Sequence, residues 1–226
     1  MRAGEFGTMK IQAFDISKAA SATSIVFDAL RQAIIKGDLP QGEHLRQDEI
    51  ARAFNVSRIP VREALLKLEQ HGLVRTQRYK GAVVSGLSLE EAQEIFAFRA
   101  LLEPEVIRQA VPRLSAGVLD EARGFCEAFA CDEDPMHWGD LNRRFHGTLY
   151  EASGLGYHLE VLNKTMDRIE PYLRAQLLLS DGMERANREH RGILEACARG
   201  DGERAAELTR AHILGAQESL SRNWQG

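Results

Sequence analysis

Three histidines and one asparagine in the second half of the chain have a spacing that suits a metal ion. Asn142 and His146 are four residues apart, so they share one face if this stretch is helical. His190 precedes the break at 200–202 by about eleven residues and His212 follows it by about the same, so an antiparallel helical hairpin places both imidazoles at one height. Three imidazoles and an amide oxygen make a metal site with an open position. The alternative is three unrelated, hydrogen-bonded histidines.

A second set of chemically suggestive residues lies in the first half, where two arginines stand beside an apolar stripe. Residues 46–70 read RQDEIARAFNVSRIPVREALLKLEQ and fit two short amphipathic helices joined by a tight turn. Ser57 is suited to cap the second helix, and Arg58 and Arg62 share one face at its N-terminal end. A recognition helix presents side chains to DNA from this position. The alternative is an ordinary helical hairpin whose arginines are solvated.

The flanking segments complete a winged helix-turn-helix. Upstream, residues 25–36 form an amphipathic helix. Downstream, two β-prone segments, 73–76 and 82–84, flank a basic link that contains Lys80 and ends at Gly81. Three helices followed by a basic hairpin favour DNA binding over the solvated hairpin.

The rest of the chain has the pattern of helices. Proline, glycine and serine signals divide it into six, at about 88–111, 115–130, 135–153, 156–179, 182–199 and 202–222. Ser88 and Glu91 form a capping box at the start of the first one. The predicted fold is therefore mainly α, an N-terminal winged helix-turn-helix followed by an all-helical antiparallel bundle of about six helices. We expect three parts: a vector-like leader and arm (1–22), the DNA-binding domain (23–85) and the helical metal, effector and dimerisation domain (86–226).

Charge differs between the two predicted domains. Residues 21–86 hold ten Lys and Arg against seven Asp and Glu, whereas residues 87–226 hold sixteen against twenty-four. A basic head on an acidic body is typical of a DNA reader joined to a domain with another task. No apolar run approaches the roughly 18 residues of a membrane span, and the three cysteines lack CxxC spacing. We expect a cytoplasmic protein without a membrane partner.

The run IIKGDLPQGEHLRQDEIARAFNVSRIPVREALLKLEQHGLV resembles the N-terminal domain of GntR-type transcription regulators, over about sixty residues. VSRIPVREAL is a specific part of the match. The resemblance implies that Arg58 and Arg62 contact DNA and that Gly81 lies at the wing tip; we count Ser57 and Lys80 with them as DNA-binding residues. Asp48 departs from the pattern, because many relatives carry there an arginine that reaches DNA. No DNA contact is expected at Asp48.

The segments LNRRFHGTLYEASG and EHRGILEACARGD, with the later Ala211-His212, resemble the FCD effector domain of the FadR-like branch. The resemblance implies that Asn142, His146, His190 and His212 bind a divalent metal of the zinc, nickel or manganese class. Many members have Asp in place of Asn142, so the neutral amide here implies weaker metal binding. Six helices rather than seven are similar to the smaller VanR-like subgroup.

Arg99 lies in FAFRALLEPE, which resembles the first FCD helix, where an arginine often faces the cavity. A guanidinium near a metal is suited to hold a carboxylate of an organic acid, so we expect Arg99 to bind the effector. The alternative is a surface arginine, or one paired with Glu103 four residues further on.

These features predict a ligand-responsive transcription regulator, a repressor and not an enzyme. A homodimer would place two recognition helices on a pseudo-palindromic double-stranded DNA operator, and a small carboxylate effector would alter operator binding. One alternative is a metal-dependent enzyme acting on a small organic acid or ester, since three histidines with an open position also describe catalytic zinc. Another is a constitutive DNA-bending protein with a structural metal.

Overall fold

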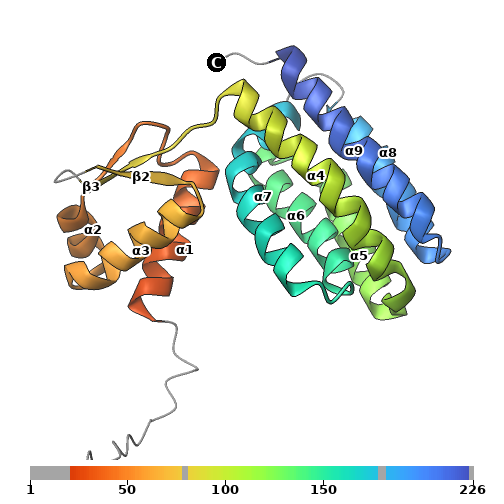
Figure 1. Cartoon of the computed structure of the whole chain (residues 1–226), viewed down its shortest axis with the longest axis horizontal. Coiled ribbons are helices and arrows are strands. Elements are labelled where there is room, and N and C mark those ends of the chain that lie inside the picture. Colours follow the sequence, from red (N-terminus) through yellow and green to blue (C-terminus); the bar gives the residue numbers. More distant parts are fainter. Residues whose placement is uncertain (1–20, 78–80, 178–181, 224–226) are drawn as a thin grey trace, which may run out of the picture.

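The computed structural model describes residues 21–77, 81–177 and 182–223, which form a small head beside a larger helical bundle (Figure 1). Residues 1–20 of the predicted leader and arm, and Lys80, lie outside the described residues. The head contains α1 (Ala22–Lys36), β1 (His44–Leu45), α2 (Gln47–Phe54), α3 (Arg58–Gln70), β2 (Val74–Gln77) and β3 (Gly81–Val84). The winged helix-turn-helix predicted from the sequence is thus confirmed.

The three strands of the head form an antiparallel sheet in the order β1-β3-β2. The two-residue strand β1 is absent from the sequence prediction, because so short a strand has no periodicity to detect. Gly81 has a φ of +88°, and a side chain there would bring its Cβ within 2.5 Å of the Leu45 carbonyl oxygen. Glycine is therefore needed where β3 begins, and it lets the wing lie against β1.

The head has its own apolar core between the three helices and the sheet. Val61, Ala64 and Leu68 of α3 are fully buried against α1 and β2. This stripe has the spacing that the sequence predicted, and its burial turns the opposite face of α3 outward. Arg58 and Arg62 lie on that exposed side.

The bundle contains the six predicted helices within the part of the chain that the structure describes, each ending within two residues of its expected limit. They are α4 (Leu89–Ala110), α5 (Ala116–Cys131), α6 (Pro135–Glu151), α7 (Gly156–Leu177), α8 (Gly182–Ala198) and α9 (Gly202–Asn223), with a short 3₁₀ turn η1 (Val111–Arg113) after α4. The Ser88–Glu91 capping box is formed. None of the described helices is long and apolar enough to cross a membrane.

Helices α8 and α9 form the hairpin on which the metal prediction depends. Gly200 adopts a φ of +72° in the turn, and the two helices then run side by side. Helix α4 lies along α9 (Figure 1), and α6 packs between α5 and α7. Residues far apart in the sequence are therefore brought to the interior of one bundle.

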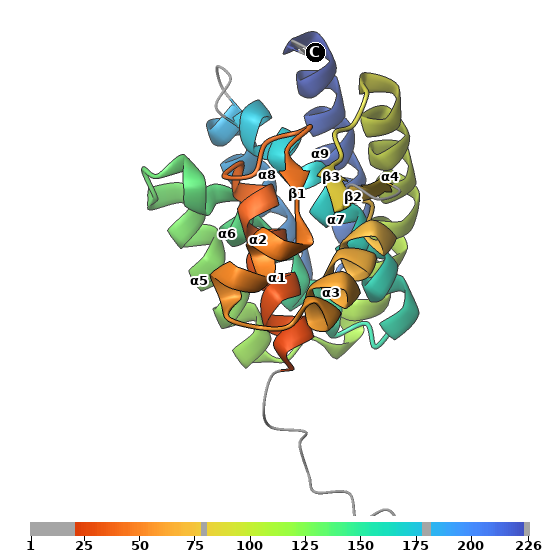
Figure 2. The ribbon, with the colours of Figure 1, turned by 90° about the vertical axis from the view of Figure 1, so that its left-hand side faces the viewer.

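The head meets the bundle through α1, the end of α3 and the helix α7 (Figure 2). At this junction Asp167 of α7, only 2% exposed, accepts hydrogen bonds from Arg31 of α1 (Nε–Oδ2 2.7 Å) and from His71 (Nδ1–Oδ2 3.0 Å), the residue that ends α3. Arg143 of α6 also binds Asp167 (2.8 Å) and reaches Glu170 (2.6 Å). Burial alone would raise the pKa of Asp167, but the Arg31 hydrogen bond and the Arg143 charge outweigh it and hold that pKa below its ordinary value. The sequence offered no partner for His71.

Candidate DNA interface and metal centre

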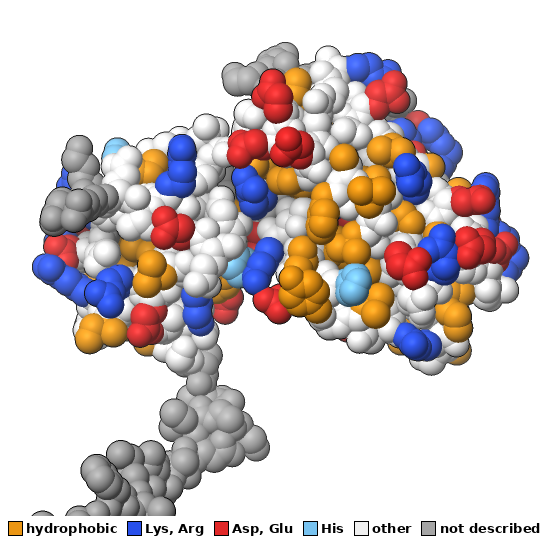
Figure 3. Space-filling model, viewed as in Figure 1, with side chains coloured by type: hydrophobic (Ala, Val, Ile, Leu, Met, Phe, Trp, Pro, Cys, Tyr) orange, Lys and Arg blue, Asp and Glu red, His pale blue; other side chains and the backbone are white. Residues whose placement is uncertain are grey.

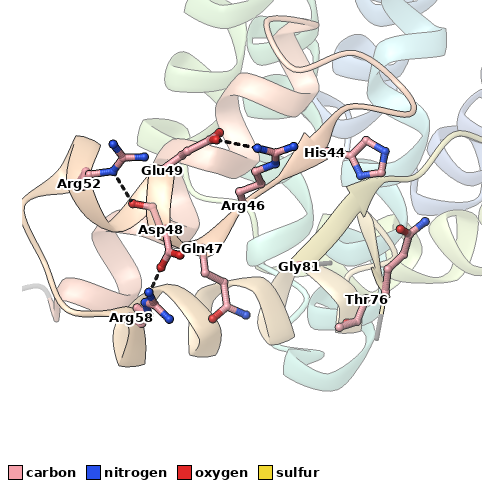
Figure 4. Close-up of a pocket in the computed structure, with 10 residues that line it drawn as sticks. His44, Arg46, Gln47, Asp48, Glu49, Arg52, Arg58, Thr76 and Gly81 are labelled. Carbon is pink, nitrogen blue, oxygen red and sulfur yellow. Dashed lines mark hydrogen bonds and ion pairs between the residues drawn. The ribbon is translucent and has the colours of Figure 1, made fainter. Parts of the chain in front are cut away.

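An open hollow of about 960 Å³ on the head lies between β1, α2, the start of α3 and the wing (Figure 4). Polar and charged side chains line it: His44, Arg46, Gln47, Asp48, Glu49, Arg52, Arg58, Thr76 and Gln77, together with Gly81. Several Lys and Arg side chains lie on the side of the head that faces away from the bundle (Figure 3). A basic concave surface next to a recognition helix suits a phosphate backbone and the edge of a groove.

The two predicted DNA-contacting arginines have different surroundings. Arg58, the first residue of α3, forms an ion pair through Nε with a carboxylate oxygen of Asp48 on α2 (Figure 4). Arg62 is exposed, and no hydrogen bond or ion pair of its guanidinium occurs among the described residues. The Asp48–Arg58 pair joins the two helices across their turn, and sequence spacing carried no signal for it because the residues are ten positions apart.

Ser57 and the wing complete this surface. Ser57 holds the N-cap position of α3 as predicted, but its side chain makes no capping hydrogen bond, which leaves the exposed hydroxyl available. The Thr76 backbone N–H donates to Glu69 Oε1 (2.7 Å), so the wing is tied to α3. Gly81 lines the hollow beside Thr76.

The three predicted metal ligands meet inside the bundle. His146 of α6, His190 of α8 and His212 of α9 are all buried, and one potential ligand atom of each lies within 4.8 Å of the others. Their ring centroids form a near-equilateral triangle, with sides of 5.1 Å, 5.2 Å and 4.9 Å. The three histidines therefore lie together in one buried cluster, as the metal prediction requires.

The hydrogen bonds of the imidazoles show which atoms remain available. His212 Nδ1 lies 2.7 Å from Glu189 Oε2, and His146 Nδ1 lies 3.4 Å from the Tyr150 hydroxyl. His146 Nε2 and both ring nitrogens of His190 are buried with no partner among the described residues. A buried nitrogen without a partner is costly, and a metal ion would satisfy it.

The environment keeps two of these imidazoles neutral, as metal coordination requires. Burial, followed by the neighbouring His190 and His212, holds the pKa of His146 well below its ordinary value. Burial, followed by His212, does the same for the pKa of His190, whose ring lies against Phe129 and Phe145 at centroid distances of 5.0 Å and 4.6 Å. Charged forms are disfavoured in so apolar a setting.

Asn142 is also buried and lines a small hollow together with His212, Arg99 and Arg185. The structure thus places the asparagine near the triad, on the face of α6 that carries His146. Its place beside His212 makes its amide oxygen a candidate ligand.

Arg99 is buried and paired, as one of the alternatives from its sequence required. Its Nε donates to Glu103 Oε1 (2.6 Å), and the Tyr150 hydroxyl donates to the other oxygen of Glu103 (2.7 Å). Burial and Glu103 raise the pKa of Tyr150 well above its ordinary value, so this hydroxyl keeps its proton. Arg99 lines both the hollow beside Asn142 and a second cavity of about 120 Å³ beside His146.

Sequence reasoning missed Glu189 and Arg185 on α8. Arg185 Nη1 lies 3.3 Å from Glu189 Oε1, and Glu189 holds His212 in turn. Gly215 on α9 makes room for this guanidinium, since a Cβ there would lie 2.5 Å from Arg185 Nη1. The i,i+4 spacing of Arg185 and Glu189 is a local signal, but ordinary surface pairs share it.

The fold and these two regions define a two-domain transcription regulator, with a DNA-binding head and a helical sensing domain. Residues 22–84 match the family described as "Bacterial regulatory proteins, gntR family", and residues 94–215 match the FCD domain. The chain belongs to the GntR family of transcription regulators and carries an FCD domain behind its DNA-binding head.

Proteins with similar sequences or structures agree with this assignment. The uncharacterised HTH-type transcriptional regulator BphR of Paraburkholderia xenovorans is 31% identical over 209 residues, 88% of this chain and 84% of the relative. The HTH-type transcriptional repressor GlaR of Escherichia coli is 29% identical over 196 residues, 82% and 89% of the two chains. The structure of E. coli McbR/YncC has a TM-score of 0.79 at 22% identity, over 90% of this chain and 98% of that one, and so shares the fold. The two named relatives are transcription regulators, the class that the sequence predicted for this chain.

Proposed function

We propose that this protein is a repressor that binds a divalent metal and a small carboxylate in its helical domain, and that the carboxylate alters operator binding. The observation that carries the proposal is the buried triad of His146, His190 and His212, whose orphaned nitrogens point to an ion. A metal held there would supply a Lewis-acidic position for an anionic ligand. Three imidazoles would suit zinc or nickel, and manganese would depend more on the oxygen ligand from Asn142.

Two of the three imidazoles have a defined donor atom in this proposal. Tyr150 and Glu189 engage Nδ1 of His146 and of His212, which leaves their Nε2 atoms for the metal. Partners of this kind orient a ligating imidazole and fix its tautomer. Asn142 would add a neutral oxygen ligand, weaker than a carboxylate.

The cavity beside His146 supports a short carboxylate as the effector. Its volume of about 120 Å³ equals the share of roughly four waters, well below the roughly 300–1,000 Å³ of cavities for drug-sized ligands. Arg99 lines it, and the partner that its guanidinium has among the described residues is Glu103, at Nε, so the terminal amino groups of Arg99 would be the donors for a carboxylate.

The junction at Asp167 supports a route from this cavity to the head. Arg143 follows Asn142 directly on α6, lines the cavity and binds Asp167 and Glu170. Asp167 in turn holds Arg31 and the His71 that ends the recognition helix. A ligand that moved α6 would therefore change the contact that sets the angle of the head.

A homodimer on a pseudo-palindromic operator completes the proposal, since two heads are needed for two half-sites. Phe98 and Leu101 are exposed on one face of α4, Leu101 to 71%, and Leu214 is exposed on the adjacent α9. Figure 3 shows hydrophobic side chains on this side of the bundle. We propose that a second copy covers them.

Leu101→Glu should give a monomer by light scattering, whereas Tyr157→Glu, at another exposed apolar site, should not. Because bacterial operators lie in the cytoplasm, the proposal implies a cytoplasmic protein.

The metal is tested first, by stripping the protein with a chelator and reloading it with zinc, nickel or manganese. Metal content and melting temperature should both rise, because an ion that binds only the folded chain stabilises it by mass action, about 2.7 kcal/mol at 100 times its Kd. His146→Ala, His190→Ala and His212→Ala should each abolish this gain, and a second substitution should add little. His158→Ala is the control outside the triad. Full metal content in all three single variants would refute the site.

The effector is tested by titrating operator binding with short carboxylates. Metal-loaded protein should lose operator affinity by roughly 5-fold to 150-fold with the right compound, the usual range of allosteric coupling. Asp167→Asn should reduce this response without changing metal content. If metal-free protein responds to the carboxylate in the same way, the carboxylate does not need the metal for its effect on operator binding.

A further inference from the structure

The ion pair between Asp48 and Arg58 lies on the α2–α3 side of the proposed DNA surface, opposite Thr76 and Gly81 (Figure 4). Asp48 lies in the first turn of α2, and Arg58 is the first residue of the recognition helix. Both side chains are largely exposed, Arg58 to 72% and Asp48 to 56%. An acid at this point repels phosphate, so Asp48 by itself does not favour binding to the DNA backbone.

We propose that Asp48 is a positioning residue that aims Arg58 at a guanine of the operator. This inference rests on the proposed DNA-binding function of the head. Asp48 forms an ion pair with Nε of Arg58, and the guanidinium has five N–H donors in a fixed planar fork. With the carboxylate on the Nε side, the end formed by Nη1 and Nη2 has no partner among the described residues and can face a base. Guanine presents two acceptors, O6 and N7, that match two parallel donors.

The same ion pair weakens the attraction between Arg58 and a DNA phosphate. A carboxylate beside the guanidinium offsets its charge, so less is gained from a sequence-independent phosphate. A bidentate contact to a base depends on direction more than on net charge, and an oriented side chain loses less conformational freedom when it binds. We therefore expect Asp48 to reduce the sequence-independent binding of Arg58 to phosphate and to favour its contact with a base.

The neighbouring groups hold Asp48 in place. Arg52 donates from Nε to the Asp48 backbone oxygen (3.2 Å), and Glu49 pairs with Arg46 rather than with Arg58 (3.3 Å). Asp48 is thus the carboxylate that reaches Arg58 among the described residues of the hollow. Arg62, one turn further along α3, has no carboxylate partner among them and is available for a phosphate or a second base.

The inference is tested by selecting preferred duplexes from a randomised DNA pool with the full-length protein. Affinities are then measured for the selected duplex, for duplexes with single base changes and for random DNA. The wild type should select a guanine at one position of each half-site, and Arg58→Ala should lose that preference. Asp48→Ala should lose most of the same preference, roughly 5-fold to 100-fold in the ratio of affinities, the range for one bidentate base contact.

Two further measurements separate positioning from charge. Asp48→Ala should bind random DNA more tightly than the wild type, and its plot of log affinity against log salt should steepen by up to about 0.9, one extra phosphate contact. The Asp48→Ala, Arg58→Ala double variant should discriminate no worse than Arg58→Ala alone. Asp38→Ala, which removes an exposed acid of the head outside the hollow, is the matched control and should keep the guanine preference.

Each other outcome contradicts the inference. An Asp48→Ala variant that binds all duplexes more tightly and keeps the guanine preference would show that Asp48 acts only as a repulsive charge. If the wild type and Arg58→Ala both prefer a cytosine at one position and Asp48→Ala does not, then Asp48 contacts that base itself. A wild type that selects no sequence would overturn the DNA-binding proposal together with this inference.

Discussion

Two of the arginine–carboxylate pairs in this protein differ in burial, one on the surface of the head and one inside the bundle. Asp48 and Arg58 are exposed to 56% and 72%, whereas Arg99 and Glu103 are each 2% exposed. An exposed pair contributes about 0–1 kcal/mol to stability, because water and salt screen it. A buried pair whose partner is removed leaves an uncompensated charge, at a cost of about 3–5 kcal/mol. The same chemistry therefore serves recognition in one place and constrains the interior in the other.

The difference extends to the groups around each pair. In the head, most residues that line the hollow are exposed to solvent. In the bundle, Glu103 accepts from both Arg99 and Tyr150, and His146 and His190 are enclosed by other side chains. The interior site is thus largely formed before any ligand arrives, which reduces the ordering cost of binding.

The largest expected effect is at the buried pair. Glu103→Gln keeps the shape of the side chain but leaves the Arg99 charge without its counter-ion, so the free energy of unfolding should fall by about 3–5 kcal/mol. Denaturant unfolding of the metal-free protein measures it. Asp48→Asn is the matched substitution at the exposed pair and should change stability by less than about 1 kcal/mol. Equal losses in both variants would remove the contrast between the two pairs.

Arg62 offers an exposed arginine without a carboxylate partner among the described residues. Arg62→Ala should weaken operator binding by about 1–3 kcal/mol if Arg62 contacts a base edge, and should leave unfolding within about 0.5 kcal/mol of the wild type. Gel-shift titration on operator and random duplexes distinguishes the cases. An equal loss on both duplexes would make Arg62 a phosphate contact, and no loss on either would place it outside the interface.

The last expected effect concerns acid stability. The pKa values of His146 and His190 are held below the roughly 6.5 of an unfolded histidine, chiefly by burial. Above that pH neither the folded nor the unfolded state is protonated there. As the pH falls below it, the unfolded chain binds protons that the folded chain excludes, so metal-free protein should lose stability, by at most about 1.4 kcal/mol per pH unit for each histidine.

Denaturation midpoints of the metal-free protein at about pH 7.5, 6.5 and 5.5 measure this loss. His190→Leu should flatten the dependence, whereas His137→Ala, an exposed histidine, should leave it unchanged. A wild type with no pH dependence over this range would mean that the buried imidazoles are protonated with little penalty.

Local patterns determined most of the secondary structure. The apolar stripe of α3, the capping box at Ser88 and the glycine break at 200–202 each depend on residues within one or two turns of a helix. Their energies are local, so their spacing along the chain is enough to locate them. The strand β1 escaped prediction because its two residues form a strand only by pairing with β3.

The histidine cluster proposed as a metal centre was also largely readable from the sequence, for a geometric reason. The i,i+4 spacing of Asn142 and His146 defines one helix face, and equal distances of His190 and His212 from a tight turn define one height in a hairpin. What spacing could not decide was that α6 faces this hairpin. That contact depends on the packing of the whole bundle, and it brings the three imidazoles together.

Charge pairing across elements was decided by the tertiary structure alone. His71 and Asp167 are far apart in the sequence, as are Arg31 and Asp167, and Asp48 meets Arg58 only because α2 and α3 cross at their turn. Arg99 was predicted as an effector ligand with a Glu103 pair as the alternative, and the bundle buries that pair beside the cavity. A sequence shows which charges exist, but their partners depend on distances of a few ångströms that only the packed helices establish.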